Sequence, residues 1–257
     1  MRDGYDSAVS FFLKRAVEDG VDRLTEVANQ LSPNSDRPLV LSGATLMDVT
    51  TKPAVADSAV VIDGDRIVAA GPRSAIKIPD GAKIIDVTGK FLLPGLWDMH
   101  SHFYQVDFGP TYLATGITTA RDVGNDIEFA TTLRDAAKQK RGLGPRMLLA
   151  GYIDGKNEYH SFDVQVDTPE EARAAVQRYK NAGYEQIKIR DNVKLATLKV
   201  IADEAHRVGM TVTGHVPKGI NAIQAVEAGM DQINHLNFAM PRSFRKLIPV
   251  THRYRLI

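Results

Sequence analysis

Two histidines lie one residue apart at the end of an apolar segment, "FLLPGLWDMHSHFYQ" (91–105). Side chains at positions i and i+2 of a strand point to the same side, so His100 and His102 would present both imidazoles together. Imidazole nitrogen is a good ligand for zinc and similar divalent ions. The pair therefore predicts half of a metal site, to be completed by side chains from elsewhere in the chain.

Three further candidates lie in or at the ends of later strand-like segments. His215 ends "TVTGHV", His235 ends "QINHL", and Lys188 lies inside the apolar "QIKIR". Any one of these histidines alone would more often be a hydrogen-bonded structural residue, and a strand lysine would ordinarily extend to solvent. Yet four of the seven histidines share this position on three different strands. We therefore expect these residues to converge, whereas His206, mid-helix in "DEAHRVG", is predicted to be a surface residue.

Lys188 restricts the kind of metal site. An ammonium group is a cation without an acceptor, so it cannot bridge two metal ions. Reaction with carbon dioxide turns the lysine into a carbamate, whose carboxylate can bridge them. Lys188 therefore fits a two-metal site if it is carboxylated, or a one-metal site if it is unmodified. The sequence does not choose between these two kinds of site.

The segments before the histidine pair show two different patterns of apolar residues. Residues 6–31 carry apolar side chains at steps of three and four, which predicts one amphipathic helix, and "SPNSDRP" then ends it. Residues 39–90 contain short segments rich in Val and Ile, with a hairpin turn at Asp63-Gly64-Asp65. We expect an N-terminal helical extension (1–38) and a small β-sandwich module (39–90).

Strands alternate with helices from residue 91 onward. The predicted helices are 168–182, begun by the capping box Thr168-Pro169-Glu170-Glu171, then 194–208 and 219–228. Six strands are predicted, at about 91–100, 117–122, 146–151, 186–190, 211–215 and 232–236. This alternation favours parallel βαβ units. A doubly wound sheet is the alternative, but no Gly-rich phosphate loop follows the first strand. We predict an α/β fold in which residues 91–257 form a TIM-like (β/α) barrel with about six of eight strands, its chemistry at the carboxyl ends of the strands.

The composition excludes several classes of partner. The chain has 257 residues, a formal net charge of +1 and no cysteine. We expect no nucleic-acid partner, no thiolate metal site and no membrane span. We expect no signal peptide within the first residues given. The expected location is cytoplasmic by default, or periplasmic or secreted if an upstream signal peptide is missing, and a homo-oligomer is left open.

Several of these motifs together resemble the amidohydrolase superfamily, in particular its imidazolonepropionase- and prolidase-like members, over residues 39–240. "LLPGLWDMHSHF" and "GITTARDVG" are similar to the first and second barrel strands, and "IKI", "TGHVP" and "INHL" to the fourth, fifth and sixth. The resemblance implies His100 and His102 as ligands of the more buried metal, Lys188 as a carboxylated bridge, and His215 and His235 as ligands of a second metal. Two Zn²⁺ ions are implied, with Mn²⁺, Fe²⁺ or Co²⁺ as alternatives.

The implied reaction is hydrolysis of a C–N bond in a small amide or dipeptide by metal-activated hydroxide. Tyr152, Tyr159 and His160 follow the third strand and are candidates for substrate contacts. The residues do not choose between N-acyl amino acids, Xaa-Pro or other dipeptides, cyclic amides and lactones.

The sequence also departs from the family. The family closes its barrel with two more strands, and an aspartate on the eighth binds metal and moves the proton. No matching residue is found here, since Asp98 and Asp122 belong to the first two strands and the tail after residue 240 shows no strand pattern. The catalytic residue is therefore unassigned. Two alternatives remain: a truncated, catalytically incompetent chain that retains the metal motifs, and a mononuclear, deaminase-like enzyme with unmodified Lys188.

Overall fold

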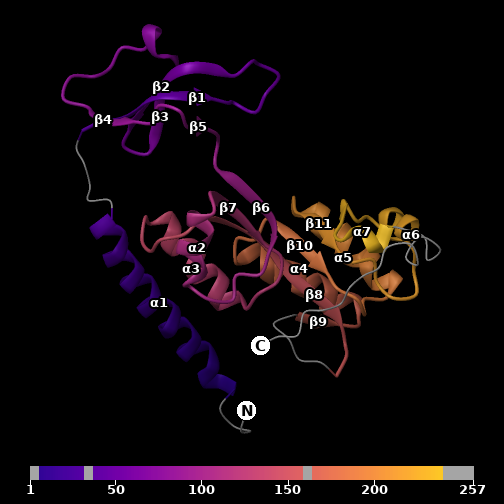
Figure 1. Cartoon of the computed structure of the whole chain (residues 1–257). Helices are drawn as coiled ribbons and strands as arrows, with labels where there is room; N and C mark the ends of the chain where they lie inside the picture. The colour runs from indigo at the N-terminus through magenta and orange to yellow at the C-terminus, as the bar shows by residue number, and fades with distance from the viewer. Residues whose placement is uncertain (1–5, 32–36, 159–163, 240–257) are drawn as a thin grey trace.

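A computed structural model describes residues 6–31, 37–158 and 164–239 (Figure 1). The first element is the helix α1 (Asp6–Leu31), with the bounds that its periodicity predicts. Its apolar face packs on α3 (Ile127–Lys138), where Val17 and Val21 are buried against Phe129 and Ala136. No helix in the described ranges is both long and apolar enough to cross a bilayer.

A small five-stranded sheet follows, in the order β3-β2-β1-β4 with β5 also paired to β1. Its strands are β1 (Leu39–Leu46), β2 (Val55–Asp63), β3 (Arg66–Pro72), β4 (Lys83–Asp86) and β5 (Phe91–Leu92), and a 3-10 turn lies at Arg73–Ala75. Asp63 pairs with Arg66 across a two-residue turn, where Gly64 takes a left-handed φ of +58°, so the predicted hairpin is confirmed. Val40, Ala59 and Val61 form its small buried core.

The larger sheet is parallel and curls into half of a barrel, as an incomplete TIM-like barrel requires (Figure 1). Its order is β12-β11-β10-β8-β7-β6, with the short β9 paired to β8. The strands are β6 (Leu96–Ser101), β7 (Ile117–Asp122), β8 (Arg146–Gly155), β9 (Val164–Val166), β10 (Gln186–Ile189), β11 (Thr211–Gly214) and β12 (Gln232–Ile233). The other helices are α2 (Phe108–Ala114), α4 (Pro169–Asn181), α5 (Leu195–Arg207), α6 (Ala222–Glu227) and α7 (Leu236–Ala239).

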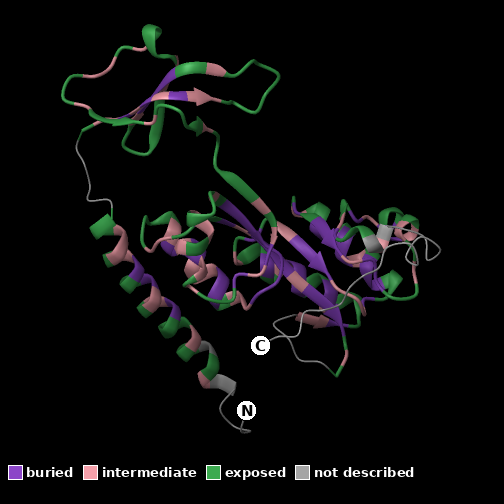
Figure 2. Ribbon diagram, in the orientation of Figure 1, coloured by how far each residue is buried: buried purple, intermediate pink, exposed green. Residues whose placement is uncertain are grey.

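The main core lies between this sheet and its helices (Figure 2). Ile187 and Ile189 on β10 are fully buried, as are Leu198 and Ile201 on α5. The predicted capping box starts α4: Thr168 Oγ1 accepts a hydrogen bond from the Glu171 amide, and the Glu171 carboxylate accepts one from the Thr168 amide. The local signal that starts α4 and the burial of the core between the larger sheet and its helices therefore favour the same structure.

Several expected bounds were wrong. The strand predicted at 91–100 is split, because residues 91–92 pair with β1 in the small sheet and β6 begins only at Leu96. Pro94 has no N–H for a sheet ladder, which accounts for the break. The last strand stops at Ile233, and His235 takes a positive φ of 64° beyond it. Helices α2 and α3 were not predicted. The division into units 1–38, 39–90 and 91–257 stays a prediction.

Candidate metal centre

Four imidazoles form a continuous row at the carboxyl ends of the parallel strands. The ring centroids of His102 and His100 are 5.5 Å apart, those of His100 and His235 4.6 Å, and those of His235 and His215 5.0 Å. His100 lies in β6 and His102 directly after it, while His215 directly follows β11 and His235 comes shortly after β12. Three separate strands thus bring four imidazoles to one place.

Lys188 lies in the middle of β10 and is only 1% exposed. Its register partners are Tyr152 on β8 and Thr213 on β11, so it points neither to an edge nor to solvent. Burial, with the positive charge of Arg121 second, lowers the pKa of Lys188 to about 8. Its own charge lowers the pKa of His100, His215 and His235, which places the lysine within electrostatic range of the row.

The same surroundings favour neutral imidazoles. Burial, followed by the charge of Lys188, lowers the pKa of His100 to about 3. Burial also lowers the pKa of His215, against the opposing hydrogen bond of Asp191, and burial together with Lys188 lowers that of His235. A metal ion binds the neutral form of histidine, so these three rings are in the state that an ion requires.

Neighbouring groups already engage one nitrogen of three of the rings. His102 Nδ1 lies 3.0 Å from the Gly124 carbonyl oxygen, His215 Nδ1 lies 2.6 Å from Asp191 Oδ1, and His100 Nδ1 lies 2.9 Å from Asn234 Nδ2. Acceptors of this kind orient the histidines of metal sites and leave Nε2 for the ion, as the Gly124 carbonyl does for His102 and the Asp191 carboxylate for His215. The amide nitrogen beside His100 is instead a donor.

The row is not a closed cage. Within the described ranges, no three or more His, Asp or Glu side chains are already arranged to hold one ion. The chemistry of the imidazole nitrogens, with polar partners beside three of the rings and a lysine nearby, nevertheless fits a divalent metal of the zinc type.

Of the residues predicted to contact substrate, only Tyr152 can be placed. It lies inside β8 rather than after it, because the strand runs on to Gly155. Its ring centroid is 6.4 Å from that of His102, and the Arg190 guanidinium lies over it at 5.3 Å. Tyr159 and His160 lie outside the described residues. Tyr152 therefore borders the histidine row, and its contact with substrate stays a prediction.

Three polar residues beside the row were missed by the sequence analysis. Asp191 and Asn234 directly contact His215 and His100. Arg121 donates from Nη1 to Gln186 Oε1 on β10 and to Gln232 Oε1 on β12, so it ties β7 to strands further round the half-barrel. In the sequence, these three residues were marked only by being polar and lying in or near an apolar strand.

Asp122 and His206 lie in other surroundings. The Asp122 carboxylate accepts hydrogen bonds from the amides of Phe103 and Gly124, which gives it a structural role in the loop after β6. His206 is an exposed residue of α5, as predicted, and its Nε2 lies 3.0 Å from Asp231 Oδ2.

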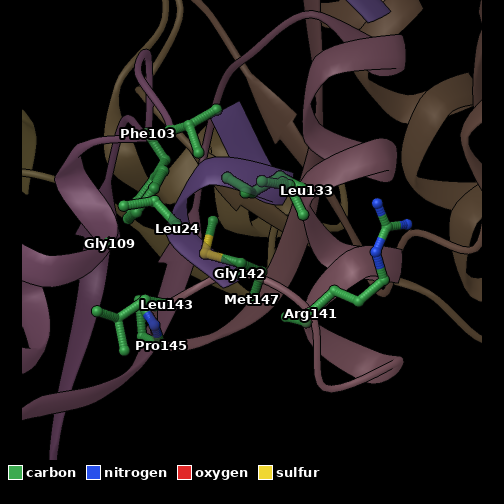
Figure 3. Close-up of a pocket in the computed structure, with 13 residues that line it drawn as sticks. Leu24, Phe103, Gly109, Leu133, Arg141, Gly142, Leu143, Pro145 and Met147 are labelled. Carbon is green, nitrogen blue, oxygen red and sulfur yellow. The ribbon is translucent and has the colours of Figure 1, made fainter. Parts of the chain in front are cut away.

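A separate apolar cavity lies beneath α1 (Figure 3). Leu24, Phe103, Leu133 and Met147 line it, and its volume is about 20 Å³. A space of that size holds about one water molecule. The cavity is therefore a packing gap between α1 and the barrel rather than a substrate site.

Comparison with known proteins places the chain in a family. The sequence model of the amidohydrolase family matches residues 91–247. Imidazolonepropionase from Streptomyces griseus is 42% identical over 64 residues, which cover 25% of this chain and 16% of that protein. A Bifidobacterium longum structure described as a candidate prolidase shares 28% identity at a TM-score of 0.67 and covers 78% of this chain and 54% of its own.

A solved Xaa-Pro dipeptidase with bound methionine in its active site is 25% identical, with a TM-score of 0.67, and the match covers 82% of this chain and 64% of that one. The chain thus spans between about half and two thirds of the length of these two structures. The family match covers most of the chain, including all the residues of the histidine row. The chain belongs to the amidohydrolase family.

Proposed function

We propose that this chain is part or all of a metal-dependent hydrolase that cleaves C–N bonds of the amide or peptide type. The observation that carries the proposal is the row of four imidazoles at the carboxyl ends of parallel strands, with the charge of the buried Lys188 on β10 acting on three of them. The amidohydrolase family generally depends on divalent metals, which supports it.

The proposed roles are those that the family resemblance implies. His100 and His102 would hold the more buried ion, and His215 and His235 would hold a second one. Lys188, once carboxylated, would be the ligand that the two ions share. Bound divalent metal, two Zn²⁺ or else Mn²⁺, Fe²⁺ or Co²⁺, would supply an acidified water and a polarised substrate carbonyl. Lys188 is buried and its pKa is lowered to about 8, so a fraction of it is the neutral amine that reacts with carbon dioxide.

Substrates are proposed only as a class. A small amide or dipeptide would enter at the carboxyl ends of the strands, beside Tyr152 on β8. The similar Xaa-Pro dipeptidase and imidazolonepropionase support substrates with such C–N bonds. Tyr152, Tyr159 and His160 remain proposed substrate contacts.

Metal retention is the direct test. The purified chain is supplied with zinc or manganese, dialysed, and assayed for bound metal. Wild type and His206→Ala, whose exposed imidazole lies outside the row, should retain metal, while His100→Ala should lose most of it. Absence of metal in the wild type, or equal content in both variants, would contradict the proposal.

The second candidate, a truncated and catalytically incompetent chain, is favoured by the edges of the half-barrel. Among the described residues, β6 and β12 are the edge strands of the sheet. Leu96, Trp97 and Met99 on β6 are exposed although they are apolar and lie on both faces of the strand. Strands apolar on both faces are ordinarily covered on both. Turnover by a version extended through two further strands, with none by this chain, would favour this candidate.

The mass of the intact protein tests the alternative of a site with one metal ion and an unmodified Lys188. Under native conditions, a carboxylated Lys188 adds the mass of one carbon dioxide, and an unmodified lysine with one bound ion would support a deaminase-like site instead.

A further inference from the structure

We propose that Asn234, held by Thr213, is a positioning residue for His100, and that its carboxamide makes a half-turn when Nε2 of that ring binds a metal. The proposal rests on the metal site proposed above and concerns a residue outside its ligand set.

Asn234 links three strands of the half-barrel. It follows β12, and its carboxamide reaches His100 on β6, with Asn234 Nδ2 2.9 Å from His100 Nδ1. The other end of the carboxamide accepts a hydrogen bond from the hydroxyl of Thr213 on β11. Asn234 is 6% exposed and Thr213 fully buried, so water has little access to compete for either bond.

His100 differs from two of its neighbours in the partner of its Nδ1. His102 faces a carbonyl oxygen and His215 faces a carboxylate, and both groups can only accept. Those two rings therefore carry a proton on Nδ1 and leave Nε2 free for an ion. The amide nitrogen of Asn234 donates to His100, which puts the lone pair on Nδ1 and the proton on Nε2. In this arrangement Nε2 of His100 cannot bind a metal.

A half-turn of the Asn234 carboxamide removes the conflict. Its oxygen then accepts from Nδ1–H of His100, and its nitrogen donates to the Thr213 hydroxyl, which accepts as readily as it donates. Both hydrogen bonds survive in either arrangement, and the carboxamide occupies the same space. Only the half-turned arrangement leaves Nε2 of His100 free, so metal binding at this nitrogen selects it. A carbonyl or carboxylate at the same place would hold His100 permanently in the binding form.

The prediction for variants follows from this difference. Asn234→Asp is almost isosteric and can only accept, so it should hold Nδ1–H and keep zinc affinity within a few-fold of wild type. Asn234→Leu has a similar size but no polar atom, and should weaken zinc binding about 10–100-fold, the range typical of lost outer-shell partners. Thr213→Val should weaken it less. A purely structural role for Asn234 predicts the opposite order, because a buried aspartate would disturb the fold more than leucine.

Zinc affinity is measured by competition with a chromophoric chelator, after circular dichroism has checked the fold of each variant. Nitrogen-15 NMR of histidine-labelled protein reports the tautomer directly: His100 in metal-free wild type should carry its proton on Nε2 and, with zinc, on Nδ1. This reading depends on no variant.

Three outcomes overturn the inference: equal zinc affinity of wild type and Asn234→Leu, weaker binding by Asn234→Asp than by Asn234→Leu, or an unchanged His100 tautomer on binding zinc. Failure of the wild type to bind zinc at all would instead refute the proposed function.

Discussion

The imidazole of His215 and the carboxylate of Asp191 meet at 2.6 Å, Nδ1 to Oδ1, at the carboxyl ends of β10 and β11. The backbone fixes both partners, since the His215 amide donates to Ile189 and the Lys218 amide donates to the Asp191 carbonyl. A carboxylate in this position orients the ring and raises the basicity of its other nitrogen.

Removal of that carboxylate should weaken metal binding. We expect Asp191→Ala to lower zinc affinity about 10–100-fold, because His215 loses its orientation. Asp191→Asn, which keeps an acceptor oxygen, should lose much less. Chelator competition measures both, and unchanged affinity in Asp191→Ala would show that the pair has no part in the site.

Replacement of Lys188 should separate stability from metal binding. Lys188→Met removes a buried amine but keeps an unbranched side chain, so the melting temperature should stay the same or rise. Metal content should fall, because no bridge can form. Lys199→Met, at an exposed position of α5, is the matched control and should change neither quantity. A large loss of stability in Lys188→Met would mean that the lysine serves the fold instead.

Acid should weaken the start of α4 through Glu171. The hydrogen bond from Lys156, followed by those from the amides of Asp167 and Thr168, lowers the pKa of Glu171 to about 2 from an ordinary 4.5. A lowered pKa in the folded state means that this stabilisation is complete above pH 4.5 and is lost as the pH falls toward 2.

Glu171→Gln should therefore flatten the decline of the urea midpoint between pH 4.5 and 2. Equal slopes for wild type and variant over this window would exclude Glu171 as a contributor. Glu170→Gln, in the same helical turn, is the control.

The contact between α1 and α3 should contribute measurably to stability. Val21 is 1% exposed, and Val21→Ala should cost about 2 kcal/mol through lost apolar burial and the cavity left behind. Phe12 on the same helix is 66% exposed, so Phe12→Ala should change the free energy of unfolding by less than about 0.5 kcal/mol. Urea unfolding measures both, and similar values would argue against the observed face of α1.

The single tryptophan reports on the open edge of the sheet. Trp97 on β6 is 55% exposed, so its fluorescence should resemble that of a tryptophan in water and be quenched readily by acrylamide. Strands added beyond β6 should cover it, shift the emission to shorter wavelength and reduce quenching. Blue-shifted emission from the chain alone would mean that the edge is already covered, for example by a second copy.

Local sequence patterns determined much of this protein. Apolar spacing predicted α1, the Thr168–Glu171 capping box predicted the start of α4, and the alternation of strands and helices predicted parallel pairing at the half-barrel. Each is a short-range property, because it depends on residues within one helix or strand and its own ends. The location of the four histidines at or near strand ends was predicted from local patterns of the same kind.

Only the tertiary structure decided which of these side chains meet. The contact of His100 with Asn234 joins residues 134 positions apart, and it depends on the curl of the sheet that brings β12 back toward β6. The transfer of residues 91–92 to the small sheet and the positive φ of His235 likewise depend on neighbours distant in the chain. Periodicity describes the face of one strand, whereas the partner of that face is set by register and closure among many strands, which no local pattern records.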